Sequence, residues 1–148
     1  MGTAQTWTHA DTNGYGGSVQ VAEFHLVADA NGMDSAITEE ELVGEVVKIE
    51  VDPNAALNPT ATLKGYEYGT KLATATRDHW MNYIIPNPAV EVVYYPLVES
   101  SATNANGALT TKLSQRRVVC ARQELDLAGA LMDVAGTNSV VVRLYVRQ

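Results

Sequence analysis

The residues best suited to chemistry in this chain are the acidic side chains of the stretch DANGMDSAITEEE, which begins at Asp29. A calcium-binding EF-hand loop also supplies many oxygen ligands, with one at position five, a glycine at six and a bidentate glutamate at twelve. Counted from Asp29, these positions hold Met33, Asp34 and Glu40, so the pattern fits only with an inserted residue. We therefore interpret the stretch as an Asx-rich turn between strands. We interpret its acidic run, Glu39–Glu41, as a solvated patch rather than an acid/base pair for glycoside hydrolysis.

Metal and thiol chemistry gain no support from residue spacing. The histidines His9, His25 and His79 share no short spacing with one another or with Cys120, whereas zinc ligands usually come in pairs a few residues apart. We expect His25 and His79 to be ordinary surface or packing residues. Cys120 follows two valines in a predicted strand, at a position that suits a small hydrophobic residue. We therefore expect its side chain to be buried as part of the packing and not to act as a nucleophile.

Local motifs of enzyme families are missing: the sequence has no G-x-S-x-G, no Walker or dinucleotide glycine pattern and no H-E-x-x-H. We predict a protein without catalysis, metal or cofactor, and a site assembled from Asp78, His79 and Cys120 is the enzymatic alternative. Aromatic side chains offer stacking on sugar rings as a further chemistry, although packing in a core or an interface is their more common use. They are Trp7, Tyr66, Tyr68, Trp80, Tyr94 and Tyr95.

The elements that would position these residues are short strands. Alternation is clearest at 138–148, where Val140, Val142, Leu144 and Val146 share one face and Val141, Arg143, Tyr145 and Arg147 the other. A second strand is predicted at Glu45–Val51, with Val47, Ile49 and Val51 facing inward. A third is predicted at Ser18–Ala28, and the hydrophobic parity changes within it, so we expect a bulge or kink near Ala22-Glu23.

Further strands are predicted at Trp80–Ile85 and Arg117–Arg122, and at Val90–Val98, where Pro96 requires a sheet edge or a break. Glu124–Leu131 is also predicted to be a strand, with a short helix at Leu125–Val134 as the alternative. Seven or eight strands separated by Gly, Pro and Asn corners indicate an all-β fold, an antiparallel β-sandwich or jelly roll. Residues 18–148 would form this single domain. Residues 1–17 would form an extended N-terminal arm that either folds back or reaches a neighbour.

Composition and charge limit the partners. The chain has 148 residues and a net charge of −7, so we expect no binding to nucleic acid. No apolar run approaches the span of a bilayer, and the first residues lack a signal-peptide layout, so we expect no membrane association and no export by that route. Four basic and fourteen acidic residues precede residue 105, whereas six basic and three acidic residues follow. We expect early and late strands to neutralise each other; contact between copies or with a basic partner is the alternative.

A family resemblance begins at Gly44. Its residues are Gly44–Pro53, Pro59–Leu63, Tyr94–Leu97, the Asn104–Gly107 loop, Leu125–Leu127 and Val140–Arg147. In the order of these strands and turns the chain resembles the decoration, or cement, proteins of tailed-bacteriophage capsids. The resemblance implies a jelly roll or β-sandwich, often a dimer or trimer, which sits on the capsid exterior and bridges neighbouring major capsid subunits.

We therefore predict a structural virion protein that is made in the host cytoplasm, binds the outside of a phage capsid and cements major capsid subunits. A carbohydrate-binding or tail-associated recognition module is the alternative. The residues expected at the partner interface come from the arm and from the outward face of the last strand. They are Trp7, Tyr15, Arg143, Tyr145 and Arg147.

Overall fold

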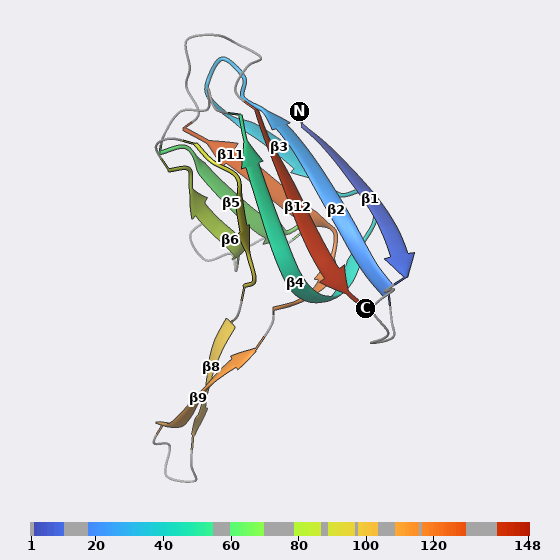
Figure 1. The fold of residues 1–148 in the computed structure, drawn as a ribbon, viewed down its shortest axis with the longest axis vertical. Coiled ribbons are helices and arrows are strands. Elements are labelled where there is room, and N and C mark those ends of the chain that lie inside the picture. The colour runs from blue at the N-terminus through green and yellow to red at the C-terminus, as the bar shows by residue number, and fades with distance from the viewer. Residues whose placement is uncertain are drawn as a thin grey trace.

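The computed structural model describes residues 2–10, 18–54, 60–69, 79–86, 89–96, 98–103, 109–115, 117–129 and 139–148. These residues form twelve strands, most of which belong to two antiparallel sheets that pack as a sandwich, as Figure 1 shows. The predicted all-β, antiparallel sandwich class is therefore confirmed. Within the described ranges, no helix has the length and apolar character needed to cross a membrane.

The larger sheet has six strands, and the last strand of the chain lies in its middle. The order is β1 (Thr3–Ala10), β2 (Ser18–Val27), β12 (Ser139–Arg147), β4 (Leu42–Pro53) and β10 (Val118–Ala121), with β7 (Val92–Tyr94) also paired to β4. Because β12 hydrogen-bonds to β2 on one side and to β4 on the other, the most β-prone segment of the sequence is held along its whole length.

The smaller sheet has four strands in the order β3 (Asp34–Ile37), β11 (Gln123–Ala128), β5 (Thr62–Glu67) and β6 (His79–Ile84). A separate two-stranded ribbon, β8 (Val98–Thr103) with β9 (Leu109–Gln115), extends away from the sandwich in Figure 1. The chain enters and leaves this ribbon at one place, since Val98 is paired with Gln115.

The core lies between the two sheets and is built by alternate residues of their strands. Phe24 and Trp80 bring the sheets together, with ring centroids 6.2 Å apart. The indole of Trp80 covers Gly65, where an added Cβ would lie 2.3 Å from the ring carbon Cε2. The side chains that fill this core are Ala22, Phe24, Leu26, Ala36, Val46, Ile49, Val51, Leu63, Trp80, Met81, Leu125, Leu127, Val140, Val142, Leu144 and Val146.

The bulge lies in β4 rather than in β2. Strand β2 pairs without a register shift with both neighbours, so the bulge that was one of the two alternatives predicted near Ala22-Glu23 is wrong. In the β4–β12 pairing, Lys48 lies opposite Tyr145 and Val46 opposite Val146, which leaves Val47 as the extra residue. This extra residue shifts the parity of the strand, so Val46 is buried in the core and Val47 is only half-buried, contrary to prediction.

The N-terminal segment is in part a strand of the sheet. Residues 3–10 fold back as β1 along β2, whereas residues 11–17 lie outside the described residues. At the other end, Gln123–Ala128 is the strand β11, so the helical alternative is excluded for these residues. Cys120 lies in a strand as predicted, but its side chain is exposed, since neighbouring Val119 takes the inward position; the prediction of buried filler is wrong.

Candidate functional site

The outward face of the six-stranded sheet carries a cluster of charged and aromatic side chains, which we call the outer-face network. Its members are Glu23, Lys48, Glu50, Arg143 and Tyr145. The pairing of neighbouring strands places these residues in rows across the sheet. In one row, Glu23 of β2 lies opposite Arg143 of β12, which lies opposite Glu50 of β4. The next row runs from Trp7 in β1 through Val21 and Tyr145 to Lys48.

Direct contacts join these side chains. The Nε of Arg143 donates to Oε2 of Glu23 at 2.5 Å, and its Nη1 lies 3.5 Å from Oε2 of Glu50. Glu50 also accepts the hydroxyl of Tyr145 at 2.9 Å and pairs with Nζ of Lys48 at 2.8 Å. The ammonium of Lys48 lies 4.1 Å from the centre of the Tyr145 ring, as in a cation–π contact.

Both carboxylates of the network are held in the charged form. Burial raises the pKa of Glu23, but hydrogen bonds from Arg143 and His25 outweigh burial and leave the pKa below its ordinary value. Burial acts on Glu50 in the same direction and is outweighed by hydrogen bonds from Lys48 and Tyr145, so its pKa is also lowered. The hydrogen bond to Glu50 raises the pKa of Lys48, which keeps that group a cation.

Four of the five predicted interface residues lie on this face. Trp7, Arg143, Tyr145 and Arg147 face outward from β1 and β12, and residue Trp7 is 40% exposed. Tyr15 falls outside the described residues. The partners Glu23, Lys48 and Glu50 were missed as site residues. Their outward parity was visible in the sequence, but which strands would flank β12 was not.

This arrangement joins the acidic early part of the chain to its basic late part. Arg143 belongs to the basic late part of the chain, and it lies between Glu23 and Glu50 of the acidic early part. The predicted neutralising contact between early and late strands is therefore confirmed, because β12 is inserted between β2 and β4.

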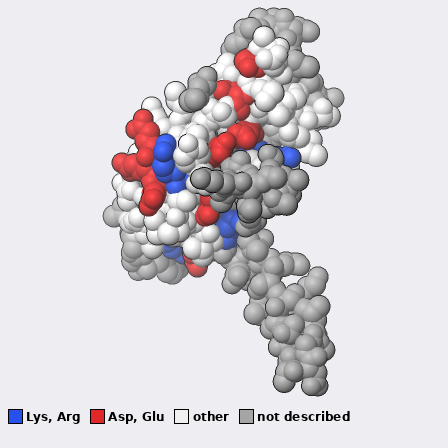
Figure 2. Space-filling view, turned by 180° about the vertical axis from the view of Figure 1, so that it is seen from behind, with Lys and Arg blue, Asp and Glu red and all other residues white. Residues whose placement is uncertain are grey.

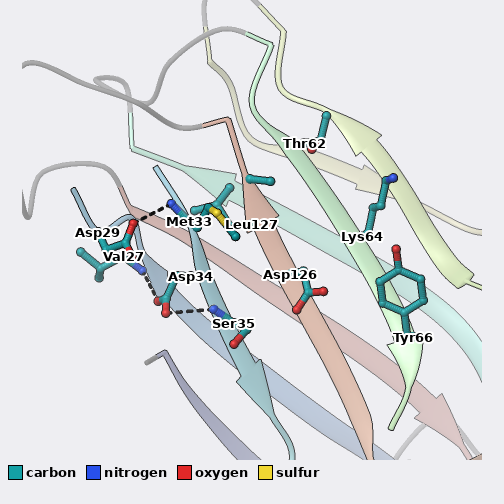
Figure 3. A pocket seen from close by; sticks show the side chains of 11 residues that line it. Val27, Asp29, Met33, Asp34, Ser35, Thr62, Lys64, Tyr66, Asp126 and Leu127 are labelled. Carbon is teal, nitrogen blue, oxygen red and sulfur yellow. Dashed lines mark hydrogen bonds between the residues drawn. The ribbon is translucent and has the colours of Figure 1, made fainter. Parts of the chain in front are cut away.

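A pocket of about 580 Å³ opens on the other side of the sandwich, against the smaller sheet. Figure 3 shows carboxylates, hydroxyls and one ammonium around it, contributed by the β2–β3 turn and by β3, β5 and β11. The described residues that line it are Val27, Asp29, Met33, Asp34, Ser35, Thr62, Lys64, Tyr66, Asp126, Leu127 and Ala128. Its volume falls within the range of small-molecule sites.

Asp29 in the β2–β3 turn and Asp34 at the start of β3 both accept hydrogen bonds from backbone amides. Oδ1 of Asp29 accepts the amides of Asn31 and Met33 at 2.8 and 3.0 Å, and these bonds lower its pKa. Asp34 accepts the amide of Val27 through Oδ2 at 2.8 Å, a contact drawn in Figure 3. The predicted Asx-rich turn is thus confirmed. In the part of the chain that is described, no group of three or more His, Cys, Asp and Glu residues is arranged to hold a metal ion.

No protein-family model matches the chain, and no curated protein matches it. Among solved structures, the enzymatically active domain of tailspike protein 4 from bacteriophage CBA120 is 12% identical, with a TM-score of 0.32. That match covers 99% of this chain but 18% of the tailspike chain. A carbohydrate-binding module of Cellvibrio mixtus lichenase 5A, solved with cellotriose, is 13% identical with a TM-score of 0.30, and the match covers 97% and 87% of the two chains. At TM-scores this low, neither similarity bears on what this protein binds.

Proposed function

We propose that this protein is a structural virion protein, which binds the outside of a phage capsid and cements neighbouring major capsid subunits without catalysis. The observation that carries the proposal is the β8–β9 ribbon. Its two strands pair with each other and with no other described strand, and it extends away from the sandwich (Figure 1). An isolated two-stranded ribbon is at best marginally stable in water, so a partner surface would stabilise it.

A cementing protein must contact more than one subunit, and this chain offers two separate contact elements. The outer-face network would form one contact and the ribbon the other. Because a capsid repeats its surface many times, two weak contacts at fixed spacing would give strong retention on the lattice. The dimeric or trimeric state and the virion location stay predictions.

Deletion of the ribbon tests the proposal. Since Val98 and Gln115 are paired, residues 98–115 can be replaced by a short Gly/Ser linker without separating β7 from β10. We expect the shortened protein to keep a cooperative unfolding transition and to lose co-sedimentation with empty phage heads, whereas the full chain co-sediments. Heads that take up none of the full chain would refute the proposal.

Glycan recognition is the second candidate, and the pocket on the smaller sheet favours it. Carboxylates, hydroxyls and the Lys64 ammonium line the pocket together with apolar side chains such as Met33, a combination suited to sugar hydroxyls and C–H faces. A glycan array followed by calorimetry on any hit tests it. Lys64→Ala should weaken binding, and Lys48→Ala on the opposite sheet is the matched control. An empty array would remove this candidate.

A further inference from the structure

Strand β1 forms one margin of the six-stranded sheet. It pairs with β2 through all eight of its residues, Thr3–Ala10, and no other described strand pairs with it. The neighbouring Gly2 donates its amide to Ser35 at 2.9 Å, so contact with the smaller sheet is made just before the strand begins. Every second residue of an edge strand directs its N–H and C=O groups outward, and β1 therefore presents a row of such groups.

Edge strands usually carry features that prevent pairing with another chain, such as charges, proline or a bulge. The sequence TAQTWTHA of β1 has no charged Lys, Arg, Asp or Glu and no proline, and its pairing with β2 has no register shift. By contrast, the opposite margin is formed by two short strands: β10, which has four residues, and β7, which has three residues and is followed by Pro96. The edge strand β6 of the smaller sheet has a register shift in its pairing with β5. Among these edges, β1 is the one shaped to accept a further strand.

Acidic side chains lie beside this edge. Oγ1 of Thr6 donates to Oε2 of Glu40 at 3.4 Å, which places the exposed run Glu39–Glu41 alongside the middle of β1. Figure 2 shows acidic side chains, with basic ones beside them, at the margin of the back view that corresponds to the side of β1 in Figure 1. A second copy paired to β1 by a two-fold axis would bring two such runs together, whereas a basic segment would be attracted.

We propose that the outer edge of β1 is a docking site for an extended, Lys- or Arg-containing segment of a partner protein, which adds a strand to the six-stranded sheet. Main-chain hydrogen bonds supply the affinity of such a strand addition, and side chains supply its specificity. Trp7, near the middle of β1, is exposed. Its aromatic side chain could therefore pack against a side chain of the added strand. The inference deepens the proposed function and rests on it, because the segment would belong to the capsid subunit.

The test uses the full-length protein and a blocked eight-residue peptide of alternating threonine and lysine. Calorimetry measures binding, and hydrogen exchange measures protection of the amides of residues 2–10. We expect the peptide to slow exchange in β1 at least several-fold. The same peptide with alternate amides N-methylated keeps its charge but loses donors, so it should give no protection.

Charge is tested by E39Q/E40Q/E41Q, and E45Q/D52N/E91Q is the control because it removes three exposed carboxylates elsewhere. We expect the first variant to weaken peptide binding about tenfold and the control much less. Equal weakening by both variants, equal binding of the methylated peptide or no protection of β1 would overturn the proposal. Protection that rises with protein concentration alone would also overturn it and assign the edge to a second copy.

The capsid assay separates this inference from the proposed function. If the protein co-sediments with empty heads while the peptide leaves β1 unprotected, the edge site is wrong and the cementing role stands. If the peptide protects β1 but the heads bind no protein, the cementing role fails and the docking edge is kept for a different basic partner.

Discussion

Replacing Arg143 by methionine tests whether the outer-face network stabilises the fold. The substitution keeps an unbranched side chain and removes the cation between Glu23 and Glu50, which lie on either side of β12. Hydrogen bonds to charged groups contribute about 1.5–3 kcal/mol, and exposed ion pairs about 0.2–1 kcal/mol. The Arg143 side chain is 32% exposed and that of Glu23 is 17% exposed, so the pair lies between these cases. We expect a loss of about 1–2 kcal/mol in the free energy of unfolding.

Arg147→Met is the matched control, because Arg147 faces outward from the same strand, is exposed and has no ion pair among the described residues. Thermal unfolding followed by circular dichroism at pH 7 should place Arg143→Met about 3–6 °C below the native protein. The control should shift by less than about 1–2 °C. Equal shifts for the two variants would refute the stabilising role of the network.

Acidity gives a second check on Arg143. The folded pKa of Glu23 is lowered from its ordinary 4.5, so the folded protein binds fewer protons than the unfolded chain in the acid range. The stabilisation is therefore present above pH 4.5 and is lost as pH falls through the folded pKa. Glu50 acts in the same direction. We expect the difference between native protein and Arg143→Met to shrink at pH 3, and a constant difference would contradict the assignment.

Three further outcomes follow from local geometry. Gly44→Ala should destabilise the protein in urea by at least about 2 kcal/mol more than Gly69→Ala. Both glycines have positive φ, but a Cβ at Gly44 would lie 2.0 Å from the backbone oxygen of Arg147 whereas one at Gly69 meets nothing within 4 Å; equal costs would contradict this packing. Gly65→Ala should displace the Trp80 indole and alter the near-ultraviolet circular dichroism. The loss in free energy of unfolding that it causes should be smaller by more than about 1 kcal/mol in a Trp80→Leu background. The same loss in both backgrounds would argue against the contact. Cys120 should react with a thiol reagent in the native protein at the rate of a small thiol, since its side chain is exposed; a rate limited by unfolding would show it to be buried.

Part of the outer-face network could be predicted from the sequence. Alternation in 138–148 was enough to put Arg143, Tyr145 and Arg147 on one face and four aliphatic residues on the other, as the structure has them. The Asx turn at Asp29 could also be predicted, because its hydrogen bonds join residues two and four positions apart. These features depend on neighbours in sequence.

Features that depend on distant residues could not be predicted in this way. The bulge at Val47 exists only in the pairing of β4 with β12, and the exposure of Cys120 depends on which side of β10 meets the core. Likewise, Arg143 gains its partners because β12 lies between two strands that precede it by about a hundred residues. Side-chain parity is set by the period-two backbone of a single strand, and the sequence alone determined it. Strand order and register are set by hydrogen bonds between segments far apart in the chain, and the tertiary structure decided those.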